Sequence, residues 1–132
     1  MIEHLDHIVL GVTDMDRSLP FYRDQLGFSL TEHHPGMCRV ETGEVPIVLV
    51  HGMPDEHPAG YGVHLYFGSE DLDDLFQNLL QRGVLPFSPT LAVDAVDAPV
   101  VGPSGAREFV VRDPDGYVLH FCDLQSTKRE RA

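Results

Sequence analysis

An internal repeat constrains the fold of this 132-residue chain more than any other feature. Three landmarks recur at a spacing of 56 or 57 residues: a strand histidine, an aspartate before a helix and a glycine after it, namely His7/His64, Asp14/Asp71 and Gly27/Gly83. A nearly constant spacing of matched elements indicates that one structural unit occurs twice. The sequence therefore predicts an internal duplication.

Hydrophobic periodicity predicts the same order of elements, strand-helix-strand-strand-strand, in each half. The expected first half has strands over 5–12, 28–32, 37–41 and 45–51, and a helix from Asp14 or Asp16 to Gly27. The expected second half has a helix over 70–82 and strands over 62–68, 87–93, 96–101, 107–112 and 117–123, which is one strand more than this order contains. The chain is thus predicted to be one domain of two modules, about 1–52 and 62–125, with a linker at 53–61 and a polar tail at 126–132.

The turn at 113–116, Asp-Pro-Asp-Gly, leads into the last strand. Proline presets φ and glycine accepts the positive φ of a tight turn, so this segment favours a hairpin. Alternation then places Tyr117, Leu119 and Phe121 on one face of the strand. The opposite face carries His120, and the same parity argument puts His7 and His64 opposite the apolar residues of their own strands.

Two segments resemble the vicinal oxygen chelate superfamily, which includes glyoxalase I, extradiol dioxygenases and bleomycin-binding proteins. One is Asp-Pro-Asp-Gly-Tyr at 113–117, followed by an alternating strand. The other is a first strand containing His7, followed by a helix that ends in Phe-Tyr-x-x-x-Leu-Gly-Phe at 21–28. The resemblance implies an α+β fold of two tandem βαβββ modules, which form an open, curled mixed sheet with the helices on its outer face.

The resemblance also implies a metal site at matching positions of this chain. Those positions are the first-strand histidines, His7 and His64, together with the fourth strands, which in the superfamily carry carboxylates. This sequence departs from that pattern, because His120 occupies the second carboxylate position and Val48 occupies the first. Imidazole suits Fe, Zn, Ni or Co, so a three-histidine site for one divalent transition metal is the main hypothesis. The alternative is a metal-free relative whose polar strand residues only line a cavity.

The function expected from such a site is metal-dependent chemistry on a small oxygen-chelating metabolite, of the oxygenase or the lyase/isomerase type. A metal-free, drug-sequestering protein is the competing prediction. Tyr66 lies on the His64 face and is a candidate hydrogen-bond donor to a bound oxygen, while Glu108 is a candidate base or outer partner of the site.

Composition limits the partners and the location. A formal net charge of −12 argues against nucleic acids and anionic membrane surfaces, which repel acidic proteins. The chain lacks an apolar run near the length of a membrane span, and its two cysteines, Cys38 and Cys122, form no paired motif. We therefore expect a cytoplasmic protein with reduced thiols. The family resemblance further implies a homodimer that acts on a small-molecule substrate.

Overall fold

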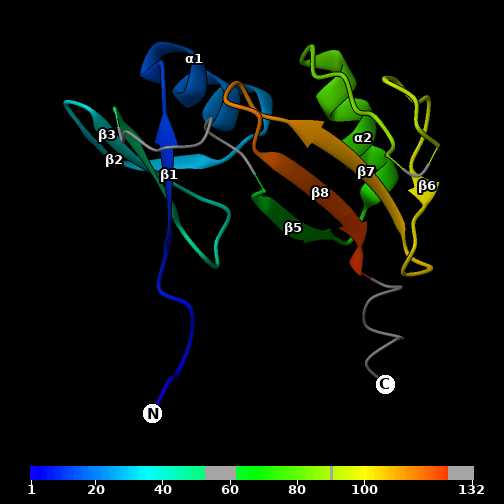
Figure 1. Ribbon diagram of the computed structural model, residues 1–132, viewed down its shortest axis with the longest axis horizontal. Coiled ribbons are helices and arrows are strands. Elements are labelled where there is room, and N and C mark those ends of the chain that lie inside the picture. The colour runs from blue at the N-terminus through cyan, green and yellow to red at the C-terminus, as the bar shows by residue number, and fades with distance from the viewer. Residues whose placement is uncertain (53–61, 90, 125–132) are drawn as a thin grey trace. The chain divides into compact units, whose positions relative to one another are not determined.

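A computed structural model describes residues 1–52, 62–89 and 91–124, so the predicted linker (53–61) and the whole predicted polar tail (126–132) lie outside the described residues. The chain divides into two compact units, Met1–Tyr61 and Gly62–Ala132. Each unit holds one four-stranded open sheet with helical structure on one of its faces (Figure 1). No helix among the described residues is both long and apolar enough to cross a membrane.

The first unit contains β1 (Ile8–Val12), α1 (Met15–Pro20), the π-helical turn η1 (Phe21–Gln25), β2 (Ser29–His34), β3 (Met37–Glu41) and β4 (Ile47–His51). Its strand order is β1-β4-β3-β2, with β1 parallel to β4 and the other pairs antiparallel. Leu10, Ile47 and Leu49 are buried on the helix side of this sheet, as the alternation predicts.

The second unit contains β5 (His64–Ser69), α2 (Leu72–Gln81), β6 (Val100–Val101), β7 (Arg107–Arg112) and β8 (Val118–Asp123). Its strand order is β5-β8-β7-β6, again with one parallel pair, β5 with β8, beside antiparallel ones. The order matches that of the first unit element by element. The predicted α+β fold of two βαβββ modules with mixed, open sheets is therefore confirmed.

Local chemistry explains where the two helical segments begin and end. The Asp14 carboxylate accepts the backbone N–H of Asp16 at 3.0 Å, and the Asp71 carboxylate accepts that of Asp74 at 3.1 Å. Each aspartate thereby satisfies a donor that the first helical turn leaves without a partner. Gly27 and Gly83 follow the helical segments with φ of 88° and 84°, a conformation that glycine adopts without steric cost.

The helix of the second unit covers one face of its sheet (Figure 1). The Phe76 ring of α2 meets the Phe109 ring of β7 edge-on at 5.1 Å, and Phe109 stacks on Phe121 of β8 at 5.1 Å. These rings are buried and form the core of the unit together with Leu79 and Leu119. We call the opposite face of this sheet the helix-free face; parity assigns to it His64, Tyr66, Glu108, Val110, Arg112, Val118, His120 and Cys122.

Three local predictions need correction, and the first covers both strands expected between residues 87 and 101. The segment 87–93 forms isolated bridges from Phe87, Ser88 and Val93 instead of a strand, and only Val100–Val101 of the expected strand 96–101 forms. Pro86, Pro89 and Pro99 interrupt this region, and proline cannot donate to a strand ladder. In the first unit, the strand expected to stop at residue 32 continues through His34, and the turn is Pro35-Gly36.

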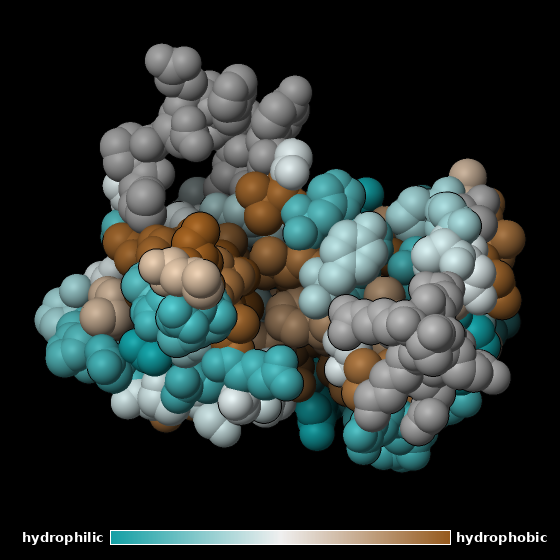
Figure 2. Space-filling view, turned by 90° about the horizontal axis from the view of Figure 1, so that it is seen from below, coloured by the Kyte–Doolittle hydropathy of each residue, from teal (hydrophilic) through white to brown (hydrophobic). Residues whose placement is uncertain are grey.

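The third correction concerns the first helix, which changes from α-helical to π-helical hydrogen bonding after Pro20. The Leu26 N–H donates to the carbonyl of Phe21, five residues earlier, at 2.9 Å. Proline lacks the N–H that an uninterrupted α-helix would use at this position. Large apolar side chains also reach the surface of the chain, among them Ile2, Leu5, Val9, Leu85, Leu91 and Val101. Figure 2 shows apolar patches among polar residues on the face that it views.

Candidate functional site

The candidate site lies on the helix-free face of the second unit and is centred on His120. Its strand, β8, is paired on one side with β5 and on the other with β7. Leu119 and Phe121 turn toward α2 and are buried, so His120 between them turns to the other face. His120 is nevertheless only 6% exposed, which is unusual for a titratable side chain.

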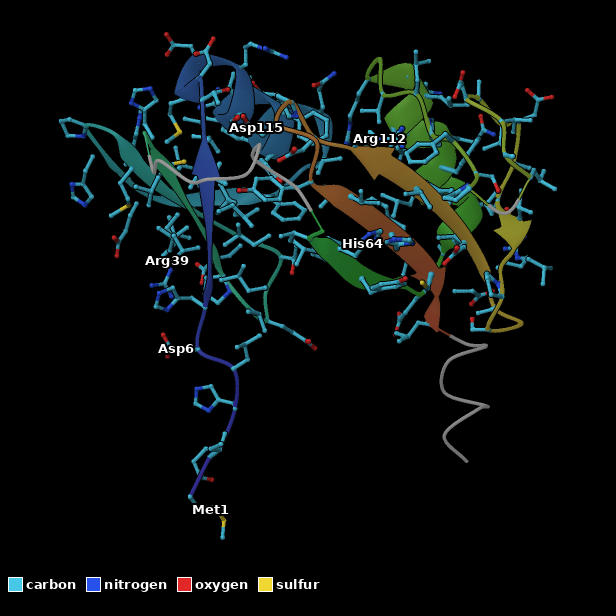
Figure 3. All side chains as sticks on the ribbon, in the orientation of Figure 1. Met1, Asp6, Arg39, His64, Arg112 and Asp115 are labelled. Carbon is cyan, nitrogen blue, oxygen red and sulfur yellow. The ribbon has the colours of Figure 1, made fainter. Side chains whose placement is uncertain are left out.

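His64 and His120 make direct contact through their rings. The Nδ1 atom of His64 lies 2.9 Å from the Nε2 atom of His120, a hydrogen bond in which one ring donates and the other accepts (Figure 3). His64 stands at the start of β5 and is exposed, whereas His120 is buried. The parallel pairing of β5 with β8 determines this contact. It places Tyr66 opposite His120 and His64 opposite Val118, which precedes His120 by two residues on the same face of the sheet.

Tyr66 covers the His120 imidazole. The two rings are stacked with their centroids 4.0 Å apart and their planes 9° apart. Tyr66 itself is 66% exposed, so one side of its ring protects His120 while the rest faces solvent. This arrangement presents a flat aromatic surface next to the histidine pair.

The other nitrogen of His120 faces Glu108 on β7. His120 Nδ1 is buried and has no hydrogen-bond partner among the described residues; the Oε2 atom of Glu108 lies 3.8 Å from it. The Cys122 thiol donates to the same oxygen at 3.8 Å. Gly102 leaves room for this carboxylate, since an added Cβ there would lie 2.9 Å from Glu108 Oε1.

Burial shifts the protonation of the groups around Glu108. It lowers the pKa of His120, with a smaller lowering from His64 and an opposing effect of the Glu108 charge. The neutral imidazole is therefore favoured at neutral pH. Burial raises the pKa of the Cys122 thiol to about 11, and the nearby Glu108 carboxylate adds to this effect. The thiol consequently stays protonated near neutrality and is a poor nucleophile.

His7 lies in the first unit, immediately before β1. Its Nδ1 atom is 2.7 Å from the Oδ2 atom of Asp6, a residue labelled in Figure 3. This hydrogen bond lowers the pKa of the Asp6 carboxyl. The second unit thus brings together four of the five predicted site residues, His64, His120, Tyr66 and Glu108. The participation of His7 in the same site stays a prediction.

The His64–His120 pair suits a metal ion in the chemistry of its donors, because imidazole nitrogens are common ligands. Its geometry is that of a hydrogen bond: the nitrogens are 2.9 Å apart and the ring centroids 5.2 Å apart, so the rings point at each other, and they would have to turn before one ion could bind both. A carboxylate behind the distal nitrogen, as Glu108 lies behind His120, is the usual outer partner of a ligating histidine. Two donors do not complete a site, and within the described ranges no group of three or more His, Cys, Asp or Glu residues is arranged to hold an ion.

Sequence reasoning missed two contributors to this site, Gly102 and Cys122. The alternation along β8 already placed Cys122 on the face of His120, which was the available signal. Its contact with Glu108 depends on the register of β7 against β8, where these two residues are directly paired. Gly102 lies in a loop before β7, so no periodicity connects it to the site.

The first unit has an apolar counterpart of the His120 position. Val48 on β4 pairs with Val9 on β1, as His120 on β8 pairs with Tyr66 on β5. Val9 and Tyr66 are 57 residues apart, which is the spacing of the repeat. The expected equivalence of Val48 and His120 therefore agrees with the strand pairing, and the carboxylates of the superfamily pattern are absent from both positions.

Comparisons with known proteins support the same assignment. The model of the glyoxalase/bleomycin resistance protein/dioxygenase superfamily matches residues 4–121. A lactoylglutathione lyase of Haemophilus influenzae is 32% identical, over 92% of this chain and 93% of its own. A bleomycin resistance protein of Geobacillus stearothermophilus is 27% identical, over 85% of this chain and 90% of its own.

Solved structures agree with the sequence comparisons. TnmS3, an antibiotic binding protein from Streptomyces sp. CB03234, superposes with a TM-score of 0.72 at 28% identity, covering 92% of this chain and 96% of its own. Together with the duplicated fold and the family match over residues 4–121, these relatives lead to one conclusion. The chain belongs to the glyoxalase/bleomycin resistance protein/dioxygenase superfamily.

Proposed function

We propose that this protein is a metal-dependent enzyme of its superfamily that acts on a small oxygen-bearing molecule bound at the helix-free face. The observation that carries the proposal is the 2.9 Å separation of His64 Nδ1 and His120 Nε2. In this proposal the two atoms are protein ligands of one divalent transition metal, and His7 is the third. A metal held by imidazoles supplies Lewis-acid polarisation of a ligand oxygen, or redox chemistry if it is iron.

Glu108 prepares His120 for this role. A carboxylate 3.8 Å from Nδ1 favours the tautomer that carries its proton on Nδ1. The lone pair of Nε2 then points toward His64, where a ligand is needed. The lowered pKa of His120 works in the same direction, because it keeps the ring neutral at neutral pH.

Tyr66 is proposed to orient the substrate. Its ring is exposed on one side and fixed by the stack on His120 on the other, which limits the number of positions its hydroxyl can reach. A phenol hydroxyl donates a hydrogen bond to an oxygen of a bound molecule. Because Val48 carries no carboxylate, proton transfer of the lyase/isomerase type would depend on Glu108 as the base.

A metal-free ligand-binding function is the second candidate, and a specific observation favours it. The hydrogen bond between His64 and His120 satisfies both facing nitrogens without an ion. The exposed Tyr66 ring then offers a stacking surface for a planar ligand. Two relatives described as a bleomycin resistance protein and an antibiotic binding protein are consistent with such a role.

Elemental analysis of protein purified without chelators separates the two candidates. The proposal expects about one equivalent of a transition metal in the wild type and less than a tenth of that in His64→Ala and His120→Ala. The matched control is His34→Ala, an exposed histidine on β2 that pairs with Glu32. Absence of metal, with no uptake on titration with Fe, Zn, Ni or Co, would reject the enzyme and favour the ligand-binding protein.

The homodimer implied by the family stays a prediction as well. Sedimentation equilibrium of the same preparations tests it, and a monomer at all concentrations would contradict it. Measuring metal content and mass on one sample also shows whether metal loading depends on assembly.

A further inference from the structure

We propose that Tyr66 is a positioning residue that holds His120 in place, so that His64 is the member of the pair that turns when the site takes up its ligand. The inference rests on the proposed function, because it gives separate roles to the two histidines that are metal ligands there. It deepens that function by naming one fixed ligand and one movable ligand. The aromatic ring of Tyr66, rather than its hydroxyl, carries this positioning role.

The His120 ring is restrained by its own strand and by the strand on one side. β8 lies inside the sheet, and His120 is only 6% exposed. Its direct partner on β7, Val110, is 1% exposed, and the Glu108 carboxylate lies 3.8 Å from the His120 Nδ1 atom. A ring packed as densely as a protein interior turns only if a neighbouring group moves. On this side the neighbours of His120 are themselves enclosed.

Tyr66 restrains His120 on the side of β5. The parallel register places the two residues directly opposite each other, and their rings stack with centroids 4.0 Å apart and planes 9° apart. Two flat rings this close restrain each other, because a tilt of one brings its edge into the face of the other. Tyr66 is 66% exposed, so solvent would replace its ring if the side chain were shortened. The position of His120 therefore depends on Tyr66.

His64 is restrained much less than His120. It is an exposed residue at the start of β5, which is an edge strand of this sheet. Its backbone is anchored nearby, since the Val118 N–H donates to the carbonyl of Val63 at 3.2 Å, so the side chain can turn without movement of the strand. Its ring meets His120 by an edge, with centroids 5.2 Å apart and planes at 32°. Exposed side chains of this kind change rotamer within picoseconds to nanoseconds.

The contacts at stake show which of the two rings turns at lower cost. The hydrogen bond between His64 Nδ1 and His120 Nε2 is lost whichever ring moves. A turn of His120 would also break the stack on Tyr66 and move Nδ1 away from Glu108. A turn of His64 toward solvent leaves both of these contacts intact. It also leaves the His120 Nε2 atom in its place, with its lone pair available to a ligand when the ring proton is on Nδ1.

Histidine ring motion in the metal-free protein tests the inference. The ring carbons of protein labelled with carbon-13 histidine give an NMR order parameter, which is about 0.85 for a rigid group and below about 0.6 for a flexible one. In the wild type we expect about 0.85 for His120 and less than about 0.6 for His64. Tyr66→Ala should lower the His120 value to about 0.6, while Tyr66→Phe, which keeps the ring, should leave it unchanged. A His120 ring as mobile as His64 in the wild type, or still rigid in Tyr66→Ala, would overturn the inference.

Val101→Ala is the matched control for the loss of an exposed side chain. Val101 is 57% exposed and lies on β6, the other edge strand of the same sheet, so its truncation should leave the His120 order parameter unchanged. Tyr66→Leu keeps an apolar side chain but removes the flat face of the ring. It should free His120 as Tyr66→Ala does, and it decides the question if Tyr66→Ala does not fold.

Metal affinity separates this inference from the proposed function. With Zn²⁺ and a competing chromophoric chelator, we expect Tyr66→Ala to bind about 3–10-fold more weakly than the wild type, as for the loss of a stacked aromatic pair. Tyr66→Phe should bind as the wild type does; an equal loss in both variants would assign the effect to the hydroxyl and overturn the inference. If the wild type takes up none of Fe, Zn, Ni and Co, the proposed function fails, whereas the order parameters still decide whether Tyr66 positions His120.

Discussion

The two units share a strand order and a helix-facing core, yet their other faces differ. At equivalent places in the register, the first unit has Val9 beside Val48 and the second has Tyr66 beside His120. On the helix side, Ile47 and Leu119 are equivalent and both fully buried. The comparison shows that one face of each sheet maintains the fold, which leaves the other face free to acquire chemistry in one copy only.

The neighbouring strand sharpens this difference. Arg39 is paired with Val48 in the first unit, and its guanidinium lies 3.6 Å from Glu41. At the corresponding place beside His120, the second unit has Val110, which is 1% exposed. A buried apolar neighbour removes water from around the imidazole, which is the first cause of the lowered pKa of His120.

Truncation of the helix-facing core should affect both units alike and give the largest effect. We expect Ile47→Ala and Leu119→Ala each to lower the free energy of unfolding by about 2–5 kcal/mol, through lost burial and the cavity left behind. Urea denaturation measures both. A cost below about 1 kcal/mol at only one position would show that the two cores are not equivalent.

Substitution of His120 should affect only the second unit. His120→Val gives the second unit the side chain of the first, and we expect metal affinity to fall by about 100-fold or more, since losing an outer partner alone costs about 10–100-fold. Competition with a chromophoric chelator measures this affinity. Val48→Ala is the control and should leave affinity unchanged; a similar loss in both variants would indicate an indirect effect of packing.

The space that Gly102 leaves for the Glu108 carboxylate can be filled without changing the charge of Glu108. Gly102→Ala places a Cβ 2.9 Å from Glu108 Oε1, so we expect a loss of about 1–3 kcal/mol in stability from overpacking. Gly68→Ala is the matched control, because its Cβ would come closest to the end of the apolar Leu124 side chain, at 3.0 Å, and that end can move. Thermal denaturation compares the stability of the two variants. Equal losses of stability would show that the space at Gly102 is not specifically needed for the Glu108 carboxylate.

The smallest effect is expected in the pH dependence of alkylation of the two thiols, Cys122 and Cys38. Burial and Glu108 raise the pKa of Cys122 to about 11, whereas burial alone raises the pKa of Cys38, against a lowering by Arg23. We expect alkylation of Cys122 in the metal-free protein, followed by peptide mass spectrometry, to rise only toward pH 11. In Glu108→Gln the midpoint should be lower, though still above 9, with Cys38 unchanged as the internal control.

The sign of the accompanying stability change follows from the same shift. Between about pH 9 and 11 the folded thiol of Cys122 keeps a proton that the unfolded one has lost. The contribution of Cys122 to the free energy of unfolding therefore has its full value below pH 9 and decreases as the pH rises through this window. Glu108→Gln should narrow the window, and an unchanged window would mean that Glu108 does not contribute.

Much of this architecture could be predicted because it depends on local patterns. The repeat of His7 at His64 predicted the duplication, and alternation predicted that His120 lies opposite Leu119 and Phe121. The segment from 87 to 101 was predicted wrongly, since its prolines remove ladder donors while its apolar residues still suggest strands. Phe87, whose ring centroid lies 4.1 Å from the Cζ atom of Arg112, belongs to that segment.

The contacts of the site depend on register, which alternation does not determine. Parity placed His64 and His120 on one face but did not indicate that β5 runs parallel to β8 with Tyr66 opposite His120. Nor did it indicate that Glu108 pairs directly with Cys122 across β7 and β8. These pairings form between residues 14 to 56 positions apart, where tertiary packing of the core decides the alignment.

The central position of β8 has a consequence for how the site is lost. Backbone amides of a strand paired on both sides exchange with solvent only when the surrounding sheet opens, so the amide of His120 should be among the slowest to take up deuterium. Binding sites on loops lose their shape in small local fluctuations. The His120 part of this site should persist through such fluctuations and be lost only when the sheet of the second unit opens.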